Sequence, residues 1–180
     1  MKKGLAYSWG PSAWYIFHTL SYTWDKNFIK LYIDFFNTIK HTIPCYICSQ
    51  NFKRKINQKG LSISENCQSK EKMIKWLVSL HNLVNKSNNK KEYNIKDVYN
   101  IYIKNNKLIL NKGHFIKFIK EYIYFNIGIN KKKNAIKLLY ILAVIFPEPT
   151  KRKILIKYIK NKKRKNIKQF IINYIHIINK

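Results

Sequence analysis

The stretch TIPCYICSQNF contains two of the chain's three cysteines, Cys45 and Cys48, directly after a proline. Cysteines at this spacing can close a small disulfide ring, and the start of a helix stabilises the thiolate of an exposed cysteine. The pair also has the spacing of half a tetrahedral zinc site, which Cys67 with His41 or His81 would complete. The residues by themselves leave three interpretations open: a redox pair, half a zinc site and two buried, inert thiols.

Two further pairs of side chains have a spacing that could serve chemistry. Trp14 and His18 are four residues apart, as are His81 and Asn85, so each pair lies on one face of a predicted helix. Rings and amides directed toward a cysteine pair would offer a stacking surface and hydrogen-bond donors to a flat, phosphorylated cofactor. Taken singly, His18, His81 and Trp14 are each more typical of a packed core than of a binding site.

The elements that must position these residues are predicted to be helices. Apolar residues recur at helical spacing over residues 9–24, 25–43, 45–56, 69–86 and 94–104. The first helix is expected to open at Pro11, and Ser69 is the predicted N-cap of the fourth, with Glu71 in its first turn. Residues 107–111 give a weak strand signal with no hairpin turn to pair it. We therefore expect an all-α fold with two or three further helices after residue 105.

The charge of the chain is strongly positive, with 36 Lys and Arg against 8 Asp and Glu, a formal net charge of +28. Such a chain attracts nucleic acid, anionic membranes or acidic partners, although the heavy use of Lys, Asn and Ile also fits A/T-rich coding. The segment FPEPTKR predicts a helix break. We expect two parts, residues 1–104 and a basic, mainly helical extension over residues 105–180. The extension would bind nucleic acid, an anionic membrane or a partner helix. Alternatively, it would pack an apolar stripe on the first part and leave its basic face solvated.

No segment has the pattern of a signal peptide, and the longest apolar run, Leu138–Phe146, is too short to span a bilayer. We therefore expect a cytoplasmic protein that is not secreted and has no transmembrane segment. In a reducing compartment a cysteine pair is more typical of catalysis, redox sensing or metal binding than of a structural disulfide.

Taken together, WGPSAWYIFHTL, IPCYICSQNF and WLVSLHNLVNK resemble the FAD-linked sulfhydryl oxidases of the Erv/ALR family over roughly residues 9–103. The family pattern is Gly-x-x-x-Trp-x-x-x-His, Pro-Cys-x-x-Cys and His-Asn-x-Val-Asn-[Lys/Arg]. The resemblance implies a four-helix bundle plus a short fifth helix, with FAD bound between helices and no metal. The residues that it assigns to FAD binding are Gly10, Trp14, His18, His81, Asn82, Val84, Asn85, Lys86, Tyr93 and Lys104.

The same resemblance implies a division of labour between the cysteines. Cys45 would accept the attack of a substrate thiolate, and Cys48 would pass electrons to the flavin, from which dioxygen takes them to give hydrogen peroxide. The implied partners are a protein dithiol or small redox-carrier protein, dioxygen and a second copy in a homodimer. Cellular members often have a shuttle cysteine pair and a structural disulfide, but here Ile95 stands where a partner of Cys67 would be. Cys67 is then either a spare buried thiol or a docking cysteine.

An oxidase without a shuttle, in an A/T-biased chain, looks most like the enzymes of large cytoplasmic DNA viruses. That likeness implies disulfide formation in the host cytoplasm, and in the virion if the source is viral. The alternative from a different class is a basic module that binds nucleic acid or membrane, with structural or zinc-bound cysteines.

Overall fold

The computed structural model describes residues 4–104, 107–108, 110–124, 126, 132–161 and 166–180. The described residues are mostly helical, with only two strands of two residues each among them, which confirms the predicted all-α fold. The elements are α1 (Gly4–Tyr22), the 3-10 turn η1 (Lys26–Phe28), α2 (Ile29–Thr42), α3 (Tyr46–Ile56), α4 (Ile63–Asn66), α5 (Lys70–Lys86), α6 (Ile95–Tyr102), β1 (Ile103–Lys104), β2 (Lys107–Leu108), α7 (Lys112–Phe118), the π-helical turn η2 (Ile119–Ile123), α9 (Lys132–Val144), α10 (Pro149–Asn161) and α11 (Ile167–Asn179).

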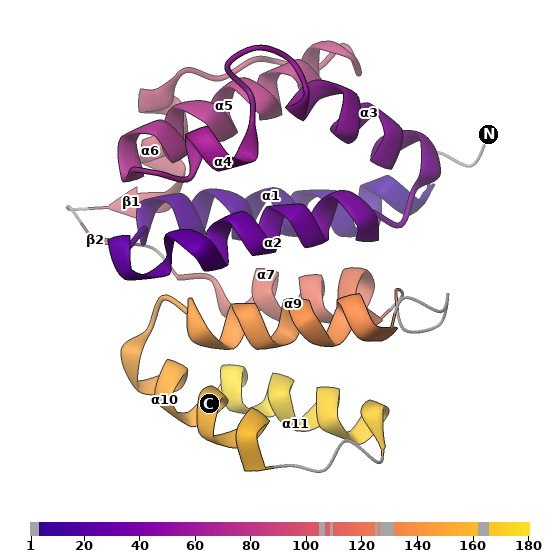
Figure 1. Cartoon of the computed structure of the whole chain (residues 1–180), viewed down its shortest axis with the longest axis vertical. Helices are drawn as coiled ribbons and strands as arrows, with labels where there is room; N and C mark the ends of the chain where they lie inside the picture. Colours follow the sequence, from indigo (N-terminus) through magenta and orange to yellow (C-terminus); the bar gives the residue numbers. More distant parts are fainter. Residues whose placement is uncertain (1–3, 105–106, 109, 125, 127–131, 162–165) are drawn as a thin grey trace.

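The helices form stacked layers (Figure 1). The α1–α2 pair lies in the middle, with α3, α4, α5 and α6 packed on one side. On the other side, α7 packs on α1 and α9 packs on α2, and α10 and α11 form the outermost layer beyond them. Both broad faces of the α1–α2 pair are therefore covered by other helices. None of the helices described here is long and apolar enough to cross a membrane.

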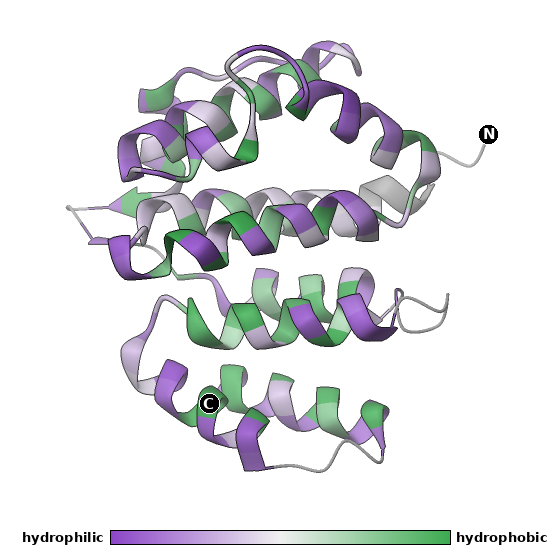
Figure 2. Ribbon diagram, viewed as in Figure 1, coloured by the Kyte–Doolittle hydropathy of each residue, from purple (hydrophilic) through white to green (hydrophobic). Residues whose placement is uncertain are grey.

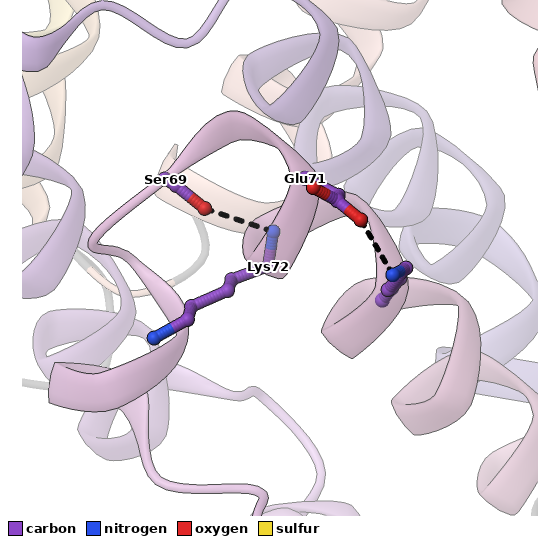
Figure 3. A network of polar contacts seen from close by, with 4 residues as sticks. Ser69, Glu71 and Lys72 are labelled. Carbon is purple, nitrogen blue, oxygen red and sulfur yellow. Dashed lines mark hydrogen bonds and ion pairs between the residues drawn. The ribbon is translucent and has the colours of Figure 1, made fainter.

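Several predicted boundaries are confirmed. Ser69 is the N-cap of α5, its hydroxyl accepting the backbone N–H of Lys72 at 3.2 Å, and Glu71 in the first turn forms an ion pair with Lys75 at 2.6 Å (Figure 3). Such a cap satisfies one of the donors that a helix start leaves without a partner. The predicted break also occurs, since α9 ends at Val144 and α10 begins at Pro149.

Other expectations were wrong. The first helix begins at Gly4 and runs through Pro11, because the turns before the proline are held by tertiary contacts: the ring of Trp9 packs edge-on against Tyr122 at 5.3 Å. Residues 103–104 and 107–108 pair as a short antiparallel hairpin, so the strand signal after residue 106 does have a partner. The extension contains more helical elements than the two or three expected, and α4 had no clear sequence signal.

The extension is joined to α1 and α2 by buried polar contacts as well as apolar ones. The hydroxyl of Tyr122 is 3.1 Å from Thr42 Oγ1 and 3.4 Å from the carbonyl oxygen of Ile39, both in α2. Tyr15 of α1 accepts the backbone N–H of Asn111 at 2.7 Å and stacks on the ring of His114. Because buried polar atoms are costly unless they are bonded, these contacts fix how the extension sits on the bundle.

One continuous cluster of buried apolar side chains includes both parts of the chain. Figure 2 shows the apolar residues of α9 alongside those of α2. The extension thus packs against the first 104 residues and completes the core on that side. The division at residues 104 and 105 stays a prediction about domains, and binding of nucleic acid or anionic membrane by residues 105–180 also stays a prediction.

Replacing Tyr122 tests whether the extension is part of the core. Tyr122→Ala should lower the free energy of unfolding by roughly 3 to 5 kcal/mol, because it empties a fully buried site and leaves Thr42 without that partner. The matched control is Tyr124→Ala, two residues along, whose side chain is 42% exposed and whose loss should cost less than about 1 kcal/mol. If urea denaturation shows that the two variants lose equal amounts of unfolding free energy, the packing of this segment on α2 is contradicted.

Candidate functional site

Cys45 and Cys48 form a disulfide at the start of α3. Cys45 is the N-cap of this helix, and its Sγ accepts the backbone N–H of Cys48 at 3.2 Å. Both residues are only partly buried. Because the two sulfurs are bonded to each other, they are not free to bind zinc, and the redox interpretation of the pair is the one that this geometry supports.

The chain leading into α3 explains why the disulfide lies at a helix start. Pro44 follows the end of α2 and cannot continue that helix, and Cys45 then has extended backbone angles. Ser49 donates its hydroxyl to the carbonyl oxygen of Lys40 at 3.1 Å, which ties the first turn of α3 to the last turn of α2. Phe52 and Ile56 bury the inner face of α3. The cysteines are thus fixed to a rigid element, as a redox pair requires.

A second group of functional side chains lies where α1 meets α5. The indole of Trp14 stacks on the imidazole of His81, with ring centroids 4.0 Å apart and an interplanar angle of 5°. His18, one turn after Trp14, is 1% exposed, and its Nε2 is 3.1 Å from Nδ1 of His81. The structure therefore brings together three of the predicted cofactor-binding residues from two helices that are distant in the sequence.

Both histidines are neutral at physiological pH. Burial lowers the pKa of His18 to about 3, with a further contribution from His81. Burial also lowers the pKa of His81 to about 4, helped by the nearby positive charge of Lys90. In a neutral pair that shares one hydrogen bond, His18 Nδ1 and His81 Nε2 must have opposite roles, one a donor and the other an acceptor. His18 Nδ1 is buried and has no partner within the described structure.

The two predicted amides act on the following loop. Asn82 donates to the carbonyl oxygen of Tyr93 at 2.7 Å and accepts its N–H at 3.0 Å. Asn85, which is buried, donates to the carbonyl oxygen of Lys91 at 2.9 Å. These bonds hold the loop between α5 and α6 against the end of α5. The amides therefore position Tyr93, whose ring lies under the ammonium of Lys91 at 5.6 Å.

The remaining predicted residues lie on α1, on α5 and on the strand that follows α6. Gly10 is one turn before Trp14 on α1, and an added Cβ would meet no atom within 4 Å. Val84 is partly buried on α5. Lys86 ends α5 and Lys104 lies in β1, and both are exposed. The set fits a flat, phosphorylated cofactor in its chemistry: ring surface, a buried nitrogen without a partner, and exposed cations for phosphate.

Sequence reasoning missed two residues of this region. Tyr102 of α6 lies against His18, with ring centroids 5.3 Å apart, and burial raises the pKa of its hydroxyl. Lys55 of α3 is 8% exposed and donates to the carbonyl oxygen of Leu83 and the hydroxyl of Ser87, so it joins the ends of α3 and α5. Neither residue belongs to a motif, and only the apolar spacing of its helix hints at burial.

Cys67 is fully buried, and its burial raises the pKa of the thiol to about 12. A thiol of this kind is inert, which favours the spare buried thiol over the docking cysteine. Ile95, at the place of a structural partner, is 43% exposed. In the part of the chain that the structure describes, no three His, Cys, Asp or Glu side chains are grouped as a metal site would need.

The buried histidine pair predicts a loss of stability in mild acid. The unfolded chain binds protons on these imidazoles below their ordinary pKa of 6.5, whereas the folded chain does so only near pH 4 and 3. Stability should therefore fall as the pH drops from about 6.5 toward 4, by at most about 3 kcal/mol per histidine at pH 4.5. Urea denaturation at about pH 7.5 and about pH 4.5 measures the difference.

His18→Gln should reduce this pH-dependent difference, because glutamine cannot take up the proton. The control His176→Gln replaces an exposed histidine of α11 and should leave the difference as it is in the parent chain. A parent chain that is equally stable at both pH values would contradict the neutral, buried pair.

Comparison with known proteins connects this geometry to a family. Residues 11–104 match the model of the Erv1/Alr family. A probable FAD-linked sulfhydryl oxidase of Acanthamoeba polyphaga mimivirus is 30% identical to the chain over 87 residues, which are 46% of this chain and 60% of the viral protein. The match thus spans less than two thirds of that relative's length. No solved structure matches the chain.

The matched segment contains the cysteine disulfide, Trp14, the histidine pair and the loop held by Asn82, and it ends at the last residue of β1. It amounts to more than half of the 180 residues. On this match, together with the site that it encloses, the chain belongs to the Erv1/Alr family.

Proposed function

We propose that the chain is an FAD-dependent sulfhydryl oxidase that forms disulfides in protein substrates. The observation that carries the proposal is the partly exposed Cys45–Cys48 disulfide at the start of α3, in a bundle that also holds Trp14 stacked on His81. Family membership and the name of the viral relative support it. When bound, FAD supplies the acceptor for two electrons and their route to dioxygen, which gives hydrogen peroxide.

The cysteines carry out the exchange with the substrate. A substrate thiolate attacks Sγ of Cys45, the Cys45–Cys48 bond breaks, and Cys48 leaves as a thiolate. The second substrate thiolate then attacks the mixed disulfide and releases Cys45. The N–H of Cys48 points at Sγ of Cys45, and it stabilises the thiolate that leaves in this second step.

Trp14, His18 and His81 bind and orient the cofactor in this proposal. The stacked indole and imidazole supply ring surface, and the neutral histidine pair presents one donor and one acceptor, so it contacts polar edges without adding charge. Asn82 and Asn85 act indirectly by holding the loop that contains Tyr93. Val84, Lys86 and Lys104 are proposed as peripheral contacts, the two lysines for phosphate.

The proposed partners are a protein dithiol or a small redox-carrier protein, with dioxygen as the final acceptor, and the proposed location is the host cytoplasm. A homodimer is also proposed. Because α7 and α9 cover one face of the α1–α2 pair, the second copy would have to use another surface of the bundle. The viral relative matches only part of its own length, so its full activity is attributed to this chain as a proposal.

The visible spectrum of the purified chain, supplied with FAD, tests the proposal. The bands of bound flavin should bleach when a dithiol is added without oxygen, and they should return in air. Cys48→Ser should keep the bound flavin but abolish its reduction by dithiol, because the disulfide can no longer form. Cys67→Ser is the matched control and should remain active, since Cys67 is buried and inert.

Two outcomes would refute the mechanism. One is a folded chain that stays colourless with excess FAD. The other is a Cys48→Ser variant whose flavin is still reduced by dithiol at the rate of the parent chain.

Trp14→Ala should weaken flavin retention at least about tenfold, because it removes the indole ring that stacks on His81 and, in this proposal, contacts the flavin. Trp24→Ala is a suitable control, since Trp24 is also partly buried but its indole N–H donates to the carbonyl oxygen of Cys67 instead. Flavin content after gel filtration measures the effect. Equal retention in the two variants would show that the stack does not hold the cofactor.

A further inference from the structure

The two residues between the cysteines are turned out to solvent. Tyr46 is 77% exposed and Ile47 is 58% exposed, which makes them the most exposed large apolar side chains in the described part of the chain. They occupy the first two positions of α3, whose inner face is taken up by Ser49, Phe52 and Ile56. The fold thus presents an aromatic and a branched aliphatic side chain directly beside the disulfide.

Such exposure needs a reason, because two large apolar side chains are unfavourable in water. The free energy falls when a partner covers them. Nothing in the helix requires apolar residues at these positions, since the core contacts of α3 come from its other face. Tyrosine in particular is enriched at contact surfaces, where its ring offers apolar area and its hydroxyl a hydrogen bond. A partner that approaches the disulfide meets these two side chains first.

The chain segment that carries these two side chains has charge of one sign. From Asp34 to Glu65 the intervening chain has no acidic residue and has five Lys and Arg. Lys40 lies in the last turn of α2, which the Ser49 hydroxyl ties to the first turn of α3, and Arg54 is exposed farther along α3. The local charge therefore complements an acidic partner. At this surface it opposes a second copy of this chain, because both copies would present the same basic segment.

We propose that Tyr46 and Ile47, with the cations around them, form the docking surface for an acidic dithiol protein whose reactive cysteine has an apolar neighbour. This inference rests on the proposed oxidase function and names the class of its substrate. The apolar contact holds the partner's cysteine beside Cys45, and the cations raise the rate of encounter. The reaction balances: the partner's dithiol loses two electrons and becomes a disulfide, and the Cys45–Cys48 disulfide takes them up and becomes a dithiol.

Binding is measured first, because it does not require turnover. The probes are two synthetic peptides with an apolar residue beside a Ser-x-x-Ser core, one flanked by Asp and Glu and the other by Lys and Arg. The acidic peptide should bind the full chain at least about tenfold more tightly at low salt, and the advantage should shrink at about 500 mM salt. The double variant Tyr46→Ser/Ile47→Ser should lose at least about tenfold in affinity for the acidic peptide.

Turnover is measured next, with the same peptides carrying Cys-x-x-Cys. The double variant should lower the ratio of kcat/KM for the acidic peptide to kcat/KM for dithiothreitol by about tenfold. The control variant is Tyr140→Ser/Ile154→Ser, which removes the same residue types, 41% and 48% exposed, from α9 and α10. It should leave both the affinity and the ratio unchanged.

The outcomes separate this inference from the proposed function. A chain that oxidises dithiothreitol but binds both peptides equally, or whose double variant binds the acidic peptide as the parent does, overturns the docking surface alone. A chain that binds the acidic peptide through Tyr46 and Ile47 but never oxidises a dithiol overturns the oxidase and keeps the docking surface. A double variant that changes only the oligomeric state overturns the inference in favour of self-association.

Discussion

The position of α1 between two sets of helices is the constraint on which the rest of the structure depends. One side of this helix carries Trp14 and His18 toward α5, and another carries Trp9 and Tyr15 toward the extension. A helix covered in this way must be apolar or internally bonded nearly all round, as buried helices are. The site residues on α1 are therefore supported by α5 on one side and by the extension on the other, which keeps the Trp14–His81 stack in a fixed geometry.

The extension matters to the site through this helix and not through direct contact with the cysteines. Tyr122, Asn111 and His114 bond or stack with α1 and α2 on the face opposite α5. The buried apolar residues of the extension share one core with those of the bundle. Without the extension, the bundle would expose apolar side chains over a large area. Most of the described lysines of the extension are exposed, whereas Lys151 is buried and donates to the carbonyl oxygen of Ile178.

The two halves of the site differ in burial, and the difference suits their proposed roles. The histidine pair is desolvated and therefore neutral, whereas the disulfide lies at a helix start beside exposed Tyr46 and Ile47. Burial gives a cofactor a fixed, dry contact surface, and exposure lets a large substrate reach a sulfur. Lys55 bonds the last turn of α3 to the end of α5, so the two helices that carry the disulfide and His81 are tied to each other.

The amino-acid sequence by itself determined the helical class, the N-cap of α5 at Ser69 and the start of α3 at the cysteines. These features follow from residue spacing and from local hydrogen bonding. The motif residues also identified the family before any contact was known. Only the tertiary structure decided that α1 continues through Pro11, because its first turns are held by residues more than a hundred positions away. It likewise decided that Asn82 and Asn85 bond the loop, that Tyr102 and Lys55 adjoin the site, and that Tyr46 and Ile47 face solvent. Each of these facts depends on which surfaces are covered by distant segments, and a local pattern contains no record of that.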